Sequence, residues 1–273
     1  MAISLFITLS MAFVACNAQE NRTYRTVCYV EGWTHWRDEP NKFETNDIDS
    51  NLCTHVVWNH GELNSTLNIV VHDNGDEDIY RSLTGLKSDA PELKVLLDIG
   101  GWPVGSEEFT KIVATPAARQ AFADEAVAYL RRFNFDGTTM METFEAEVTG
   151  STTPRLLLVA GITANSWQIG QSFEVTEMAK TVDWLDVRAF DLHGPWEGAL
   201  RHHSTLFSPT ADTSDSIDHM IQLIVNDNVP KEKIDLGIPL FGHTLTLTDP
   251  TNTDLGAPIA NSQETVNYYE VRA

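Results

Sequence analysis

Lys94-Val95-Leu96-Leu97-Asp98-Ile99 is a short apolar run whose surroundings determine the fold class. Its length and composition are typical of a strand that is buried on both faces. An amphipathic stretch at residues 116–133 follows it, and a weaker apolar run at residues 134–136 comes next. A strand, a helix and another strand in this order predict a βαβ unit with parallel strands.

The same alternation continues along the chain in both directions, with another amphipathic stretch at residues 215–225. The runs that we expect to form strands are residues 26–30, 54–58, 94–99, 134–136, 156–162, 184–191 and 234–239. A chain of 273 residues with this pattern is typical of a single α/β barrel. We therefore predict an α/β fold, namely an incomplete TIM-type (β/α)8 barrel.

Two parts of a complete barrel are missing from the pattern. Leu156 follows Phe135 so closely that the fourth unit is shorter than the roughly 30 residues that a strand and its helix take. No apolar run after residue 239 suits an eighth strand, and residues 247–262, rich in Thr, Asp, Asn and Pro, are expected to form a loop. Because closure removes sheet edges, the first and last strands should remain unpaired and allow self-association.

The acidic composition restricts the partners of the chain. Against 39 acidic residues stand 18 basic ones, and the formal net charge is −21 at pH 7. Nucleic acids and anionic membrane surfaces require positive patches, so both are excluded as expected partners. A neutral polysaccharide remains compatible with this charge.

The amino terminus is typical of a secretory signal. Residues 3–14 form an apolar run too short to span a bilayer, and Ala15-Cys16-Asn17-Ala18 offers small residues for cleavage after Ala18. We expect residues 1–18 to be a signal peptide and residues 19–273 to form one secreted domain. A disordered terminus or a buried helix is the alternative. No later stretch is apolar enough to cross a membrane.

Cysteine use and glycosylation triplets fit the secretory route. Loss of Cys16 with the signal would leave Cys28 and Cys53 as one available pair in an oxidising compartment. The triplets that begin at Asn21 and Asn64 match the N-glycosylation pattern, so both asparagines are candidate acceptors.

Five motifs stand at or next to the expected strands. They are Cys28-Tyr29-Val30-Glu31-Gly32-Trp33, Leu52-Cys53-Thr54-His55, Leu96-Leu97-Asp98-Ile99-Gly100-Gly101-Trp102, Asp191-Leu192-His193-Gly194-Pro195-Trp196-Glu197 and Gly237-Ile238-Pro239-Leu240-Phe241-Gly242-His243. In this order they resemble glycoside hydrolase family 18, the chitinases and chitinase-like lectins. The resemblance implies a TIM-type barrel, chitin or N-acetylglucosamine oligomers as ligands, and a disulfide between Cys28 and Cys53.

A sixth motif begins but is not completed. Asn134-Phe135-Asp136-Gly137 resembles the start of the family signature D-G-x-D-x-D-x-E. Aligned without gaps, this signature places Thr139, Met141 and Thr143 where the family has Asp, Asp and the acid Glu. Neither Thr nor Met protonates a leaving oxygen near neutral pH. We therefore expect no catalytic residue and no hydrolysis.

A gapped alignment is the alternative. Met140, Met141, Phe144 and Val148 have helical spacing, so a helix that starts directly after Gly137 is our preferred interpretation. The end of the fourth strand and its loop would then be absent. Glu142, the nearest acidic residue, would be a solvated helix residue. Neither alignment supplies the acid.

Three further positions differ from the family pattern. Phe190 stands where the family has a Tyr that holds the acetamido carbonyl of the substrate, and Arg188 stands where it usually has Met. Asp98 likewise replaces a small residue of the third-strand motif. The resemblance thus implies weakened oxyanion support as well as a missing acid.

Three tryptophans are the candidate sugar-binding residues. Trp33, Trp102 and Trp196 follow the first, third and sixth expected strands, at the face where barrel loops build binding sites. Flat aromatic rings pack against the apolar face of a sugar ring; ordinary packing under loops is the alternative. Asp191 keeps its family position and is assigned to substrate binding. Like Asp136, it is otherwise a structural carboxylate.

The histidines of the same region suggest no metal centre from spacing alone. His193 and Glu197 lie four residues apart, and His202 precedes His203 directly, but no Cys, Asp or Glu stands at a spacing that completes a metal site. We expect these side chains to form hydrogen bonds within loops, and we expect neither a metal nor another cofactor.

The sequence as a whole predicts a secreted, non-catalytic, chitinase-like protein that binds chitin or N-acetylglucosamine oligomers. One alternative is a truncated isoform or gene-model fragment without a function of its own. The other is an active chitinase whose acid is a residue that the motif does not identify.

Overall fold

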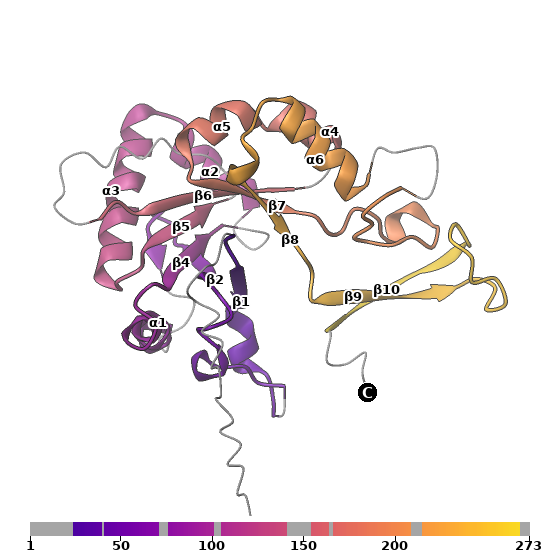
Figure 1. The fold of residues 1–273 in the computed structure, drawn as a ribbon, viewed down its shortest axis with the longest axis horizontal. Helices are drawn as coiled ribbons and strands as arrows, with labels where there is room; N and C mark the ends of the chain where they lie inside the picture. Colours follow the sequence, from indigo (N-terminus) through magenta and orange to yellow (C-terminus); the bar gives the residue numbers. More distant parts are fainter. Residues whose placement is uncertain are drawn as a thin grey trace, which may run out of the picture.

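A curled parallel sheet forms the body of the protein. The computed structural model describes residues 24–39, 41–70, 76–100, 105–140, 154–163, 166–208 and 215–267. In this part of the chain, parallel strands follow one another in the order β1-β2-β4-β5-β6-β7-β8 (Figure 1). They are β1 (Val27–Glu31), β2 (His55–Leu63), β4 (Lys94–Ile99), β5 (Gly137–Met140), β6 (Leu157–Thr163), β7 (Trp184–Arg188) and β8 (Ile234–Gly237), and the short β3 (Ile69–Val70) pairs antiparallel with β2. The sheet is an incomplete TIM-type (β/α)8 barrel, as expected.

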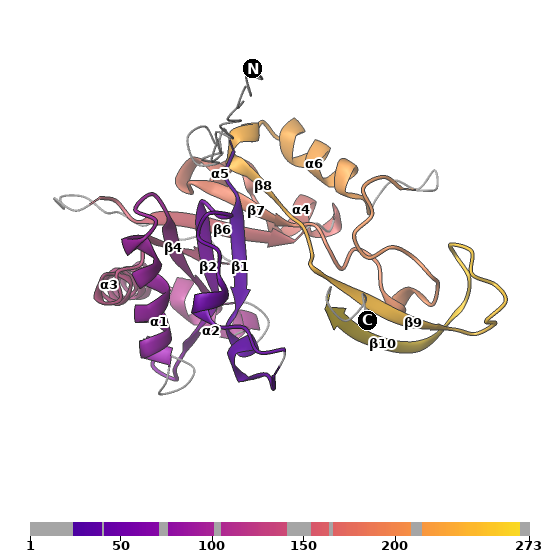
Figure 2. The ribbon, with the colours of Figure 1, turned by 60° about the horizontal axis from the view of Figure 1, so that its bottom comes forward.

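Helices cover the outer face of this sheet (Figures 1 and 2). They are α1 (Asp76–Gly85), α2 (Gly105–Val113), α3 (Pro116–Arg132), α4 (Ser166–Ser172), α5 (Val175–Thr181) and α6 (Ile217–Asn226), with 3-10 turns η1 (Gly32–Trp36), η2 (Thr45–Asp47), η3 (Leu86–Ser88), η4 (Pro195–Glu197) and η5 (Lys231–Lys233). The start of α3 has a clear cause: Thr115 accepts a hydrogen bond from the amide of Ala118, and Pro116 needs no helical partner for its nitrogen.

The core lies on both faces of the sheet because neighbouring strand residues point in opposite directions. Leu97 packs outward beneath α1–α3, whereas its neighbour Leu96 packs inward against Val57 and Val159. A second outer cluster forms between β6, β7 and the helices α4–α6. The inner cluster is small, which leaves the rest of the inner face to polar side chains.

The fourth strand corrects the preferred alignment. Gly137–Met140 is a strand, β5, that pairs in parallel with β4 and β6. The interpretation of this stretch as the start of a helix is therefore wrong, because pairing on both sides overrides a short helical pattern. Gly137 has to be glycine here, since a Cβ atom would lie 2.2 Å from the carbonyl oxygen of Leu157. Residues 141–153 lie outside the described part of the chain.

A β-hairpin carries the loop that was expected over residues 247–262: residues 248–258 lie between its strands, whereas residue 247 and residues 259–262 are in the strands. β9 (Phe241–Leu247) and β10 (Ile259–Asn267) pair antiparallel and extend away from the helices (Figure 2). Thr244, Leu245, Thr246 and Leu247 alternate polar and apolar residues, which is the signal that identifies a half-buried strand. The loop prediction holds only for the segment between the two strands.

A disulfide joins Cys28 of β1 to Cys53, just before β2, with 5.9 Å between their Cα atoms. It closes a loop over a sequence separation of 25 residues. Constraining a loop of this size in the unfolded chain stabilises the fold by about 3–4 kcal/mol.

Side chains bridge the open seam between β1 and β8, where no described strand joins the two. Arg25 donates hydrogen bonds from Nε and Nη2 to the carboxylate of Asp235, at 2.9 and 2.8 Å, and from Nη2 to the carbonyl of Glu232, at 2.7 Å. Its guanidinium also lies over the ring of Trp184, 4.7 Å from the centroid. The seam is therefore held together at the amino ends of its two strands.

Candidate functional site

A buried ion pair occupies the inner face of the sheet towards the carboxyl ends of its strands. Asp98 of β4 is fully buried; its Oδ1 accepts a hydrogen bond from the hydroxyl of Thr139, and its Oδ2 accepts one from Nη2 of Arg188 at 3.0 Å. Gly161 of β6 leaves room for Arg188, because a Cβ atom there would lie 3.4 Å from Nε. Three of the positions that depart from the family pattern, Asp98, Thr139 and Arg188, thus form one connected network.

Phe190 also contributes to packing rather than to polar chemistry. Its ring meets that of Phe241 edge to face, with 5.5 Å between centroids. Phe190 therefore anchors the start of β9 at the point where the family pattern has a tyrosine hydroxyl.

A second polar layer lies nearer the amino ends of the strands. The hydroxyl of Tyr29 and Nε1 of Trp184 both donate to the carboxylate of Asp186, the latter at 3.0 Å. Burial raises the pKa of Asp186 to about 6, although both hydrogen bonds favour the ionised form. Burial and the charge of Asp186 also raise the pKa of Tyr29, so Tyr29 stays protonated and donates. The ionised carboxylate is thus held in an unfavourable environment at neutral pH.

We expect Asp186→Asn to raise the free energy of unfolding at pH 7.5 by about 1–3 kcal/mol. The pKa of Asp186 is about 6 in the folded protein against 3.8 for the free group, so the stability that the protonated group supports is present below the unfolded pKa and lost as pH rises through 6. Urea denaturation of parent and variant at pH 7.5 and 4.5 measures this effect.

The gain should largely disappear at pH 4.5. Burial, assisted by Arg25, lowers the pKa of His55 to about 4. The neutral ring of His55 therefore contributes stability that is lost as pH falls. This contribution is common to both proteins and cancels in the comparison. An equal difference at the two pH values would contradict the assignment to Asp186.

Trp33 lies in η1, directly after β1, and is 54% exposed. Its Nε1 donates to Glu31 at 3.2 Å, and Glu31 also accepts hydrogen bonds from the side-chain amide of Asn59. The guanidinium of Arg37 covers one face of the indole at 4.2 Å from its centroid. The ring is therefore held by contacts at its Nε1 and on one face, and about half of the side chain remains exposed.

Trp196 lies in η4, which packs against β10, and is 63% exposed. The turn that carries it is supported by His193, whose Nδ1 lies 2.9 Å from Glu197 and whose Nε2 lies 3.0 Å from the carbonyl oxygen of Asp215. The hydrogen-bonding role expected of His193 and Glu197 is confirmed. Asp136 is likewise structural, since it binds Lys87 and the amide of Val95.

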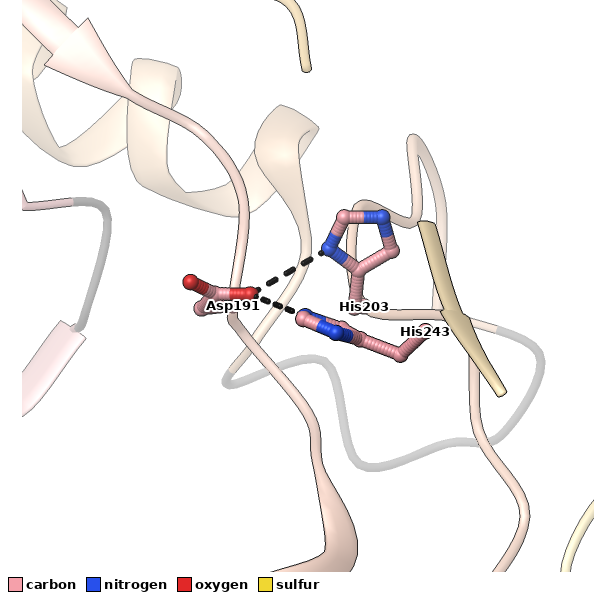
Figure 3. A group of neighbouring side chains, drawn as sticks. All are labelled: Asp191, His203 and His243. Atoms are coloured by element: carbon pink, nitrogen blue, oxygen red, sulfur yellow. Dashed lines mark hydrogen bonds and ion pairs between the residues drawn. The ribbon is translucent and has the colours of Figure 1, made fainter. Parts of the chain in front are cut away.

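Asp191 meets two histidines that sequence spacing did not connect to it (Figure 3). Its Oδ1 lies 2.7 Å from Nε2 of His243 at the start of β9 and 3.4 Å from Nδ1 of His203 in the loop after η4. The two histidines also line a pocket of about 720 Å³ between this loop and the hairpin. The partners come from separate segments, so only the fold reveals this cluster.

Other candidate residues are only partly placed. Trp102 and Asn21 lie outside the described residues, as do Glu142 and the expected signal peptide. Asn64 is in the turn between β2 and β3, where its side-chain oxygen accepts hydrogen bonds from the amide and the hydroxyl of Thr66 at 2.9 and 2.7 Å. Each described helix is too short or too polar to cross a membrane.

The family sequence model of the glycosyl hydrolases family 18 matches residues 25–141 and 138–273, two segments that meet at β5. Together with the incomplete barrel, this match shows that the chain belongs to that family. The two segments overlap where the structure has β5 and where the signature stops.

Chitinase-3-like protein 2 of Homo sapiens is 31% identical over 93% of this chain and 73% of its own length. Chitotriosidase-1 of Mus musculus is 30% identical over 86% of this chain, which spans 56% of that relative. The solved structure of human YKL-39, described as a pseudo-chitinase with retained chitooligosaccharide binding properties, superposes with a TM-score of 0.82 at 30% identity and covers 91% of this chain and 77% of its own.

Proposed function

We propose that this protein is secreted and binds chitin or N-acetylglucosamine oligomers without hydrolysing them. The observation that carries the proposal is the buried bond from Thr139 to Asp98. Thr139 stands where the family signature has a carboxylate, and Arg188 neutralises Asp98. A structural ion pair thus occupies the centre of the barrel.

The description of one solved neighbour supports the sugar ligand. Chitinase-3-like protein 2 is among the most similar relatives, and YKL-39 is described as keeping chitooligosaccharide binding while being a pseudo-chitinase. This chain has the same family fold and an interior in which a catalytic carboxylate is replaced at Thr139. Retained binding without catalysis is therefore the function that fits both the fold and the interior.

The binding surface would lie on the exposed tryptophans. Trp33 and Trp196 follow β1 and β7, and both of their loops adjoin β10: Arg37 reaches Asn267 of β10 at 3.3 Å, and η4 packs against the same strand. We assign these two rings, with Trp102, to stacking against sugar rings, and Asp191 to a polar contact with the ligand.

Trp33→Ala and Trp196→Ala should each weaken retention on chitin severalfold, because an aromatic contact contributes about 0.5–1.5 kcal/mol beyond simple burial. Isothermal titration with chitotetraose and a chitin-bead assay measure the change. Trp36→Ala is the matched control: Trp36 is equally exposed in the same turn η1.

Trp102→Ala belongs to the same series. Unchanged retention in all three variants would place the ligand elsewhere. If the folded parent protein retains no sugar at all, the chain has no such function and the fragment interpretation holds.

We also propose self-association through the open edges. Leu236, Ile238 and Leu240 on or after β8 are exposed, the last two at 75% and 77%. Exposed strand edges with apolar side chains favour pairing with another chain. Sedimentation velocity between 1 and 100 µM, as an order-of-magnitude range around typical association constants, should show mass increasing with concentration. Ile238→Lys with Leu240→Lys should abolish the increase; a monomer throughout would refute the proposal.

A further inference from the structure

Asp191, His203 and His243 present three metal-binding atoms to one point (Figure 3). Their ligand atoms all lie within 4.8 Å of one another. One side chain follows β7, one belongs to the loop after η4 and one stands on β9, so the fold holds them from three directions. Two imidazoles and one carboxylate form a common set of protein ligands for Zn²⁺ and neighbouring transition metals.

The separations suit a small tetrahedral ion. In a zinc site with bonds of about 2.0–2.1 Å, neighbouring ligand atoms lie about 3.3 Å apart. Asp191 Oδ1 and His203 Nδ1 are already 3.4 Å apart. The contact from Asp191 to His243, at 2.7 Å, has to open by roughly 0.6 Å to reach the same separation. A rotation of the exposed Asp191 carboxylate is enough for this change.

A hydrogen-bonded Asp191–His243 pair alone does not account for His203. Nδ1 of His203 is buried and forms no hydrogen bond within the described part of the chain. An imidazole nitrogen is a common protein ligand of divalent transition metals. A metal ion would give this buried nitrogen a direct bond in addition to its 3.4 Å contact with Asp191.

The surroundings leave room for a further ligand. His203 and His243 line the pocket of about 720 Å³, which provides access for an ion and a position for water. Arg201, which also lines this pocket, pairs with Glu197 at 3.3 Å. Asp191 supplies the carboxylate of the cluster, and two imidazole rings complete it.

We propose that Asp191, His203 and His243 bind a divalent transition metal ion, Zn²⁺ in the first place. This site shares Asp191 with the proposed sugar-binding surface, and it does not involve the position of the missing acid. The ion would hold β9 and the loop after η4 to the segment after β7, and it would add to the backbone hydrogen bond from Leu192 to the carbonyl oxygen of His203 at 2.9 Å.

Titration of the chelator-treated full chain with Zn²⁺ tests the proposal by calorimetry, and Co²⁺ provides a visible absorption signature of histidine coordination. One ion per chain is expected, with a Zn²⁺-dependent rise in melting temperature. His203→Ala and His243→Ala should each weaken Zn²⁺ binding at least tenfold and remove the rise.

His202→Ala is the matched control, since His202 is the exposed neighbour of His203 and lines the same pocket outside the cluster. It should bind Zn²⁺ like the parent. Equal Zn²⁺ affinity in the parent and the three variants would mean that the ion binds to other surface groups, and it would overturn the proposal. Absence of Zn²⁺ binding by the parent would overturn it as well. Melting curves of the metal-free variants check folding; if an alanine variant unfolds, His203→Asn or His243→Asn replaces it with the same expected loss.

Discussion

Replacing either partner of the Asp98–Arg188 pair is expected to destabilise the folded protein by about 3–5 kcal/mol. Arg188→Met leaves the fully buried carboxylate of Asp98 without its cation, and Asp98→Ala leaves a guanidinium inside the barrel without its anion. Uncompensated charges of this kind are much more costly than the loss of an exposed pair. Urea denaturation monitored by tryptophan fluorescence measures the change.

The double variant separates charge from packing. Asp98→Ala combined with Arg188→Met removes both charges, so its stability should return to within about 1–2 kcal/mol of the parent or exceed it. Lys180→Met serves as the surface control, because Lys180 and Glu177 are 62% exposed and should contribute less than about 1 kcal/mol. Additive losses in the double variant would mean that the two side chains act separately.

No chitinase turnover is the second result that we expect. Loss of a general acid lowers the rate by about 10²–10⁴-fold even where the remaining geometry survives, and here Phe190 removes a hydroxyl as well. Release of a fluorophore from an N-acetylglucosamine oligomer should therefore equal that of a heat-inactivated sample over a long incubation.

Glu142→Gln tests whether Glu142 acts as a substitute acid. Turnover above the heat-inactivated control would contradict the prediction, and its loss in Glu142→Gln would identify Glu142 as a substitute acid. Turnover that persists in the variant would assign the acid to another residue.

The barrel was predictable from the sequence because its evidence is local and repeated. Central apolar runs such as Lys94–Ile99 are short and buried on both faces, and amphipathic helices lie between runs of this kind. β5 was misjudged because a stretch of Gly137–Met140 carries too few residues for its period to be decisive. Its conformation is set by β4 and β6, which the local pattern does not contain.

For the candidate sites, too, the sequence shows the individual residues, whereas only the fold shows how they are connected. Substitutions at Asp98, Thr139 and Arg188 were visible as separate departures from a motif, but their connection requires the sheet register that brings three strands together. The cluster around Asp191 was missed for a similar reason. His203 and His243 are 40 positions apart on this numbering and meet only because the hairpin folds back against the loop after η4.

The bond between Thr139 and Asp98 also constrains the evolutionary history of the chain. Thr139→Asp alone would place a second carboxylate against one that is already buried, and two such groups in contact do not both ionise. Arg188 would then face two competing anions. Changing Asp98 or Arg188 first would leave the other charge unpaired, at the cost expected above. The three positions are therefore coupled: a stepwise return to the motif residue passes through a less stable protein whichever position changes first.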